Sequence, residues 1–341
     1  MKNQFLCIGS VALLSLTGCD QDQTLLTSPT SDVTTRAHLG AFALVSSNTS
    51  GLLSIYAVGA AVANPASIDL DQRHLQVPYP DADGIVYDAA RDAVYHVDRS
   101  NSQLVSLSSI STRTDGEMVM PGATGPSTFS NGREATQYHN KVVVADDVTP
   151  GRLASYHVND AHISDYRWYD VGFEVWGIQA TEKDLWAIQD ATNRVAYFRD
   201  FFKAKSGSLS ITSEVAIEGL VRTHGISYDA DADLMVLTDI GSAGSPDDGA
   251  LIIISNFSEK FAAAGNSGTI SLSDQIRIAG NLTELGNPVD VAVKASAGAI
   301  FVAERAQQKF LVFEIPESNC NCAPIYATPC AGASAVTLDF D

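Results

Sequence analysis

Four polar residues of the chain could together coordinate a divalent cation: Asp83, Asn131, Glu174 and His224. Carboxylate and amide oxygens suit calcium, whereas the imidazole of His224 shifts the preference toward zinc or manganese. A metal bound there would act as a Lewis acid and lower the pKa of a bound water, with His224 or Glu174 as general base. The four residues are far apart in the sequence, so only a repeated fold could bring them to one point.

A repeated phrase of short apolar runs supplies such a fold. Its clearest copies are GIVYDAARDAVYHVDRSNSQLVSL (84–107) and GISYDADADLMVLTDIG (225–241). Val, Ile, Tyr and Phe dominate the runs, and Asp, Asn, Gly and Ser dominate the turns, which is typical of strands. The polar residue that ends each second run recurs about 52 residues apart, at Ser46, Asp98, Asp146, Gln189, Asp239 and Glu304. We call these six residues the anchors.

Short strands that repeat every ~40–50 residues indicate a β-propeller with one four-stranded blade per repeat. Six copies in phase favour an all-β, six-bladed propeller over a large β-sandwich. The long interval between the last two anchors is predicted to hold loop insertions at 242–249 and 259–288. The first copy lacks its leading strand, and the chain ends in a strand-like run, 335–340. Because an open ring would leave a bare sheet edge, we predict that 335–340 closes the ring as the innermost strand of the first blade.

The candidate metal ligands occupy one position in these repeats. Counting fifteen residues back from the anchors gives Asp83, Asn131, Glu174, His224 and Val289. Innermost strands surround the central channel, so residues at their entry are predicted to converge on one channel mouth. Polar residues also gather there because the mouth is wet, or to satisfy backbone groups at strand starts. Trp176 enters an inner strand and is a candidate ligand-binding residue at the same mouth.

These phrases resemble NHL-type repeats and the six-bladed senescence-marker-protein/gluconolactonase-like superfamily. In the lactonase-like families, metal ligands of the types Glu, Asn and Asp precede the Gly of similar phrases, and Asp83-Gly84 and Asn131-Gly132 match that pattern. The resemblance implies a divalent-metal-dependent lactone or ester hydrolase. A non-enzymatic module that binds a small ligand or an envelope protein is the leading expectation, because fold alone does not specify activity.

The N-terminus reads as a lipoprotein leader. Lys2 precedes an apolar stretch too short to span a bilayer as a mature helix, and Leu16-Thr17-Gly18-Cys19 resembles the bacterial lipobox. We therefore expect a signal peptide over 1–18, lipidation of Cys19, a Ser- and Thr-rich tether over 19–38, and the propeller over 39–341. The expected location is the cell envelope, on its periplasmic or extracellular face, and Asp20 slightly favours the inner membrane.

The net charge limits the classes of binding partner, and the cysteine content indicates a disulfide. A formal net charge of −19 repels phosphate backbones, which makes nucleic acid a poor partner and suits cations or basic proteins. Three cysteines, Cys320, Cys322 and Cys330, lie in one segment near the C-terminus. In an oxidising envelope we expect one disulfide to Cys330, from Cys322 or from Cys320, in preference to a metal site.

Overall fold

The computed structural model describes residues 41–59, 70–242 and 244–340. These residues belong to the compact unit His38–Asp341, which is separate from Met1–Ala37. The predicted signal peptide, Cys19 and most of the tether lie outside the described residues. No helix within the described ranges is long and apolar enough to cross a membrane.

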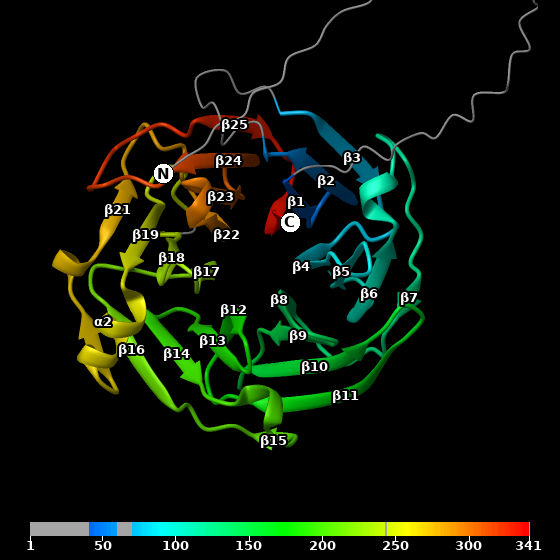
Figure 1. The fold of residues 1–341 in the computed structure, drawn as a ribbon, viewed down its shortest axis with the longest axis horizontal. Helices are drawn as coiled ribbons and strands as arrows, with labels where there is room; N and C mark the ends of the chain where they lie inside the picture. Colours follow the sequence, from blue (N-terminus) through cyan, green and yellow to red (C-terminus); the bar gives the residue numbers. More distant parts are fainter. Residues whose placement is uncertain (1–40, 60–69, 243, 341) are drawn as a thin grey trace, which may run out of the picture. The chain divides into compact units, whose positions relative to one another are not determined.

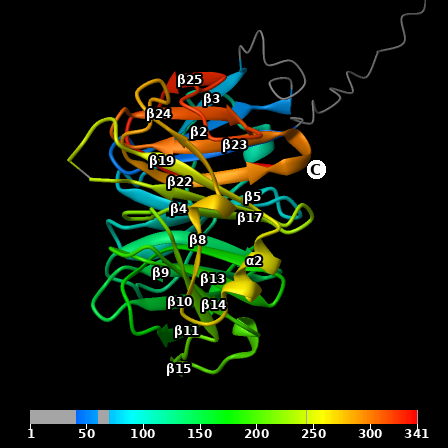
Figure 2. The same ribbon diagram turned by 90° about the vertical axis from the view of Figure 1, so that its left-hand side faces the viewer.

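Six small sheets form a ring around a central channel, which makes this unit a six-bladed β-propeller as predicted (Figures 1 and 2). From the channel outward, blade 1 consists of β26 (Ala333–Asp339), β1 (Phe42–Ser47), β2 (Leu52–Ala57) and β3 (Gln72–Gln76). Blade 2 consists of β4 (Ala82–Asp88), β5 (Ala93–Asp98), β6 (Gln103–Ser108) and β7 (Ala123–Thr124). Blade 3 consists of β8 (Gly132–Tyr138), β9 (Lys141–Asp146), β10 (Arg152–Val158), β11 (Ile163–Asp170) and β15 (Gly207–Ser208).

Blade 4 consists of β12 (Val175–Thr181), β13 (Asp184–Gln189), β14 (Arg194–Phe198), β16 (Ser213–Ile217) and β20 (Gly268–Ile270). Blade 5 consists of β17 (Ile226–Asp229), β18 (Leu234–Asp239), β19 (Ala250–Ser255) and β21 (Ile276–Ala279). Blade 6 consists of β22 (Pro288–Lys294), β23 (Ala299–Glu304), β24 (Lys309–Glu314) and β25 (Tyr326–Pro329). Neighbouring strands are antiparallel, except that β15 and β20 add to their sheets in parallel. The innermost strands β26, β4, β8, β12, β17 and β22 adjoin one another around the channel.

The C-terminal strand closes the ring, as the sequence predicts. β26 pairs antiparallel with β1, and Val336 lies opposite Val45. Ser334 Oγ donates a hydrogen bond to the Ala82 carbonyl of blade 2, and Val336 N–H donates to Asp290 of blade 6 at 2.7 Å. The first and last parts of the described chain therefore form one blade that is tied to both of its neighbours.

The core consists of six apolar seams, one between each pair of adjacent blades. The seam between blades 1 and 2, for example, packs Leu44 and Leu53 against Val94 and Val105. Strands alternate their side chains between two faces, so each blade contributes to the seam on either side. This packing fixes the inner strands and, with them, the residues that line the channel.

Two sequence expectations about connections are corrected. The predicted insertion 259–288 contains most of α2 (Phe257–Ala264), together with β20 and β21. The structure pairs Cys320 with Cys322, so the expected Cys322–Cys330 disulfide is wrong, and Cys330 is a free, buried thiol. Cys330 packs in the seam between blades 6 and 1, whereas Cys320 and Cys322 pack against the seam between blades 5 and 6.

Candidate functional site at the channel mouth

Three anchors, Asp146, Asp239 and Glu304, hold the loop that leads into an inner strand. Asp146 accepts hydrogen bonds from the backbone N–H groups of Ser130 and Asn131, and Asp239 does the same for Val221 and Arg222. All six anchors are buried. Because a buried carboxylate needs such donors, these three anchors act as structural clamps rather than as ligands for another molecule.

The residue after each anchor lies beside the residue that begins the inner strand. Its backbone N–H donates to the carbonyl of that entry residue, as in Asp147 to Asn131 at 3.0 Å and Asp190 to Glu174 at 2.8 Å. The same bond defines five entry residues: Asp81, Asn131, Glu174, Arg222 and Asn287. Each blade from 2 to 6 therefore presents two adjoining residues at the mouth.

The four predicted ligands come from two layers of the channel. Asn131 and Glu174 are entry residues, whereas Asp83 and His224 lie two residues after the entry residues Asp81 and Arg222 of their blades. The cause is hairpin length. The turns of blades 3 and 4 have two residues, for example 139–140, and those of blades 2, 5 and 6 have four, for example 89–92. A fixed count from the anchor therefore reaches different depths in different blades.

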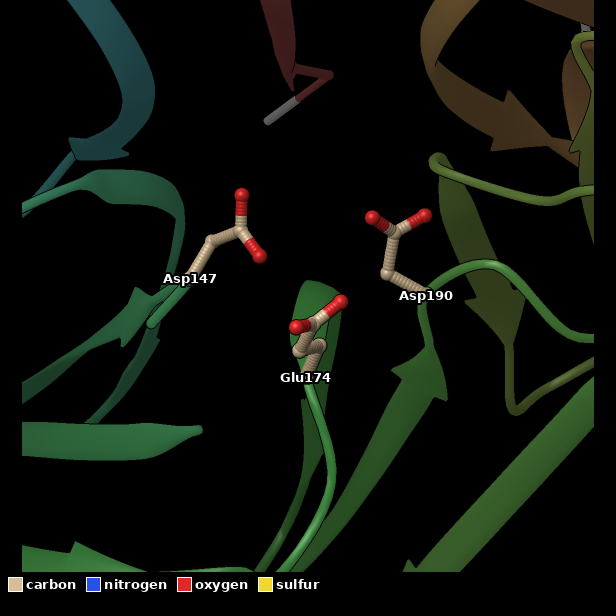
Figure 3. Close-up of side chains that lie close together, drawn as sticks. All are labelled: Asp147, Glu174 and Asp190. Carbon is tan, nitrogen blue, oxygen red and sulfur yellow. The ribbon is translucent and has the colours of Figure 1, made fainter. Parts of the chain in front are cut away.

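Three carboxylates meet at the mouth between blades 3 and 4 (Figure 3). One oxygen from each of Asp147, Glu174 and Asp190 lies within 4.8 Å of the others. Of the predicted ligands, only Glu174 belongs to this group, which we call the acidic trio. Asn131 adjoins it, because its Nδ2 donates to Asp147 Oδ2 at 3.0 Å. Sequence reasoning missed Asp147 and Asp190, although both directly follow anchors.

Arginines neutralise two of the three carboxylates. Arg222 binds Asp190 with both ends of its guanidinium, at 2.8 and 2.7 Å. Arg133 lies 3.3 Å from Asp147 and 3.3 Å from the buried Asp83. Glu174 has no arginine partner among the described residues; its Oε1 accepts a hydrogen bond from Thr149 Oγ1 at 2.5 Å.

Trp176 lies in a stack that crosses three blades. The His224 ring is parallel to it at 3.6 Å between centroids, and the Arg133 guanidinium lies 3.9 Å from its centroid. Two groups this close cannot share one face, so Arg133 and His224 cover opposite faces of the indole. Trp176, the predicted ligand-binding residue, therefore leaves only the edge of its indole for a ligand.

The protonation states follow from these contacts. Burial alone would raise the pKa of Asp190, but His224 and Arg222 outweigh it and hold that pKa well below its usual range. Burial lowers the pKa of His224, although Asp190 opposes the effect. Its Nε2 lies 3.2 Å from Asp190 Oδ1, and its Nδ1 has no hydrogen-bond partner in the described chain. His224 is therefore neutral near pH 7.

Below the mouth, the channel widens into a cavity of about 270 Å³. Glu134 of blade 3 and Asp290 of blade 6 line it and share a hydrogen bond. Burial raises the pKa of both carboxyls, and the charge of Asp290 raises the pKa of Glu134 further, whereas the hydrogen bond from Glu134 lowers the pKa of Asp290. Glu134 is therefore the member of the pair that retains its proton at neutral pH. No lysine or arginine lines this cavity among the described residues.

Comparison with known proteins supports the fold. No protein-family model matches the chain, and no curated protein sequence matches it. Similar solved structures include a chain of a nidogen/laminin complex (TM-score 0.61, 12% identity, covering 88% of this chain and 98% of that one). A candidate 6-phosphogluconolactonase from Bacteroides fragilis has a TM-score of 0.57 and 11% identity, and the match covers 88% of this chain and 98% of that one. A Bacteroides caccae protein of unknown function has a TM-score of 0.56 and 9% identity, and the match covers 89% of this chain and 100% of that one. At such identities the likeness shows a β-propeller fold and nothing finer.

Proposed function

We propose that this protein is a non-enzymatic binding module of the bacterial cell envelope, and that its channel mouth binds a positively charged ligand or protein segment. The observation that supports this most is the acidic trio: two of its carboxylates are paired with arginine, and Glu174 is left as an accessible, unpaired charge. A net charge of −19 adds a long-range attraction for basic partners.

The envelope location rests on the sequence. Cys19 and its lipobox-like neighbours lie outside the described residues, so lipid anchoring remains part of this proposal. The nidogen/laminin complex is an example of a similarly folded chain within a protein complex. A rigid ring with variable loops suits such a role, because the blades hold the mouth residues in fixed positions.

A divalent-metal-dependent hydrolase is the second candidate, and the spacing of the acidic trio favours it. Asp147, Glu174 and Asp190 would hold the ion, and the ion would supply Lewis-acid activation of a lactone or ester carbonyl. The fit is poor, however, because Asp147 Oδ2 and both oxygens of Asp190 already bond to arginine. Asp83, a predicted ligand, is likewise paired with Arg133 and lies 3.7 Å from Arg99.

The experiment that separates the two candidates measures metal content and peptide binding on the same samples. Elemental mass spectrometry is applied to the purified wild-type protein, to Glu174→Gln, and to the control Asp247→Asn on an exposed loop. Calorimetry then measures binding of a lysine- and arginine-rich peptide. We expect no stoichiometric metal, and peptide binding that Glu174→Gln weakens about tenfold and added salt weakens further.

Two results would contradict the proposal. Near-stoichiometric metal that is lost in Glu174→Gln would instead support the hydrolase and justify screening of lactones and esters. Absence of peptide binding in the wild-type protein, or equal binding by Glu174→Gln, would remove the acidic trio as the binding site.

A further inference from the structure

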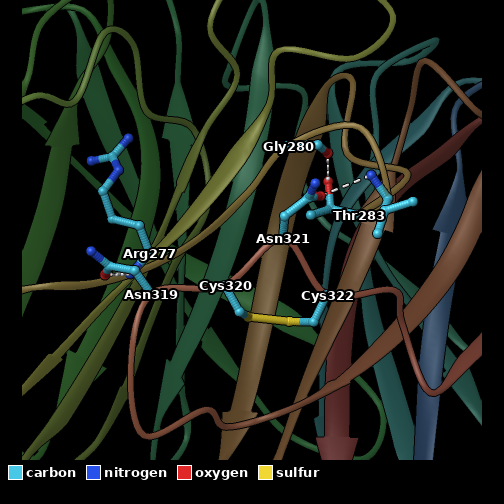
Figure 4. Close-up of a disulfide and its surroundings, with 8 residues drawn as sticks. Arg277, Gly280, Thr283, Asn319, Cys320, Asn321 and Cys322 are labelled. Carbon is cyan, nitrogen blue, oxygen red and sulfur yellow. Dashed lines mark hydrogen bonds between the residues drawn. A yellow bond between two sulfur atoms is a disulfide. The ribbon is translucent and has the colours of Figure 1, made fainter.

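The Cys320–Cys322 disulfide (Figure 4) lies in a strap that joins blades 5 and 6 at the outer strand of blade 5. The strap leaves blade 6 after β24, reaches the outer strand β21 of blade 5, and returns to form β25. At β21, Cys320 accepts a hydrogen bond from Ala279 N–H and donates one to the Arg277 carbonyl, both at 3.0 Å. The strap therefore covers the edge of blade 5 through backbone pairing.

Two asparagines on either side of Cys320 fix the strap independently of the disulfide. Asn319 Oδ1 accepts from Arg277 N–H, and Asn321 bonds to Leu282 N–H and to Asn281, each at 2.9 Å. Gly280 makes room for Asn321, because a Cβ at Gly280 would lie 2.5 Å from the Asn321 side chain. These contacts hold the strap whether or not the sulfur atoms are joined.

The disulfide itself contributes little constraint to the fold. It encloses a single residue, and a cross-link removes less entropy from the unfolded chain as its loop becomes shorter. Both sulfur-bearing residues are half-buried beside the exposed Asn319 and Asn321, so a small thiol can approach them. A disulfide that is reachable and not needed for the fold has the features of an exchangeable one.

We propose that Cys320–Cys322 is a redox-active disulfide that exchanges with dithiol reductants while the propeller remains folded. A thiolate of the dithiol attacks one cysteine sulfur, which forms a mixed disulfide and releases the other cysteine as a thiolate. The second thiol of the reductant then displaces the bound cysteine and closes the reductant's own disulfide. Two electrons and two protons pass to Cys320 and Cys322, and the reductant is oxidised by the same amount.

Cys330 provides an internal control. It is 5% exposed, and burial raises the pKa of its thiol, so it stays protonated and sheltered in the folded protein. It also packs in a different seam from the disulfide. Labelling of Cys330 therefore reports unfolding, whereas labelling of Cys320 and Cys322 without Cys330 reports exchange in the native state.

The test treats the full-length protein with dithiothreitol under native conditions, traps free thiols with N-ethylmaleimide and locates the labels by peptide mass spectrometry. We expect labels on Cys320 and Cys322, none on Cys330, and an unchanged circular dichroism spectrum. A second arm exposes Cys322→Ser to glutathione disulfide, and we expect a mixed disulfide at Cys320. Cys330→Ser is the matched control and should exchange like the wild-type protein.

Three outcomes would overturn the proposal. One is a disulfide that resists reduction until denaturant is added. Another is simultaneous labelling of Cys330, which would mean that reduction requires unfolding. The third comes from the double variant Cys320→Ser, Cys322→Ser: a collapse of its thermal midpoint would show that the bond is structural.

Discussion

The mouth and the interior of the channel both contain acidic residues that lie close together, but their carboxyl groups differ in protonation state. At the mouth, Arg222 pairs with Asp190 and keeps that carboxylate ionised. In the interior, Glu134 and Asp290 share a hydrogen bond with each other and accept backbone N–H groups, and burial raises the pKa of both. The carboxylates at the mouth and those of the cavity therefore differ in charge, because arginines pair with the former and, among the described residues, none lines the cavity.

This difference in charge assigns the two regions different roles: the mouth residues serve binding, and the interior residues stabilise the ring. Ionised groups at the mouth can attract a partner through solvent, and Glu174 pairs with no arginine in the described part of the chain. The interior pair instead holds the closing strand, because Asp290 accepts the N–H of Val336 in β26. We therefore expect substitutions in the interior and in the arginines to change folding, and substitutions at the mouth surface to change binding.

Removal of residues 332–341 should have the largest effect on stability, because it deletes β26, the innermost strand of blade 1, and opens the ring. Without β26, the strand β1 loses its inner partner and Asp290 loses a hydrogen-bond donor. We expect loss of a cooperative thermal transition, measured by circular dichroism. An unchanged melting point would show that the channel closes without β26.

Arg133→Met tests the arginine that links mouth and interior, since it contacts both Asp83 and Asp147. Truncating one partner of a buried ion pair should lower the free energy of unfolding by about 3 kcal/mol at pH 7. Burial raises the pKa of Asp83 to about 6 even with Arg133 and Arg99 opposing it. Below that value Asp83 is neutral, so the loss should shrink at pH 5. Urea denaturation at both pH values measures the effect.

The control for Arg133 is Arg199→Met, which removes an exposed arginine. It should change the free energy of unfolding by less than about 0.5 kcal/mol. The double variant Arg133→Met, Asp83→Asn should recover part of the loss, because no unpaired charge remains at Asp83. A loss that is equal at pH 5 and pH 7 would contradict the role assigned to Asp83.

Most of the fold could be predicted from the sequence. The anchors repeat in phase because each lies near the end of the second strand of its blade. Asp146, Asp239 and Glu304 also accept hydrogen bonds from the loop that leads into the inner strand. The closing strand was predictable because 335–340 had no partner in its own repeat, and an open ring is unfavourable. These features depend on local strand chemistry, which a single sequence records.

The candidate site was less predictable, because it depends on depth within the channel. Asp83 and Asn131 occupy the same count from their anchors, yet a difference of two residues in hairpin length puts them in different layers. The acidic trio arises across the boundary between blades 3 and 4, and nothing in one repeat indicates its neighbour's partner. The disulfide was misassigned because spacing does not reveal that Cys330 faces another seam.

Asp290→Asn tests the interior pair. A carboxyl with a raised folded-state pKa binds more protons when folded than when unfolded, so its contribution to stability is present at low pH and is lost as the pH rises. The variant has no such loss, and its amide oxygen can still accept from Val336 N–H. Relative to the wild type, we expect it to gain about 2 kcal/mol in free energy of unfolding between pH 5 and pH 8.

Denaturation curves at the two pH values measure this gain, and Asp247→Asn on an exposed loop provides the comparison. That control should follow the wild type at both pH values. If Asp290→Asn did so too, the interior carboxyl would be ionised in the folded protein, and the contrast with the mouth would disappear.

Glu174→Gln should have the smallest effect on stability and so sharpens the contrast from the other side. Among the described residues Glu174 pairs with no arginine, so the substitution leaves no buried charge without a partner. A glutamine oxygen can still accept the hydrogen bond from Thr149 Oγ1. We expect a change below about 0.5 kcal/mol in free energy of unfolding, similar to that of Glu259→Gln on the exposed face of α2. Loss of the Glu174 charge should also lower the pKa of Asp147, which burial and the neighbouring carboxylates raise. A loss of stability as large as that of Arg133→Met would place Glu174 with the structural carboxylates of the interior instead of the binding surface of the mouth.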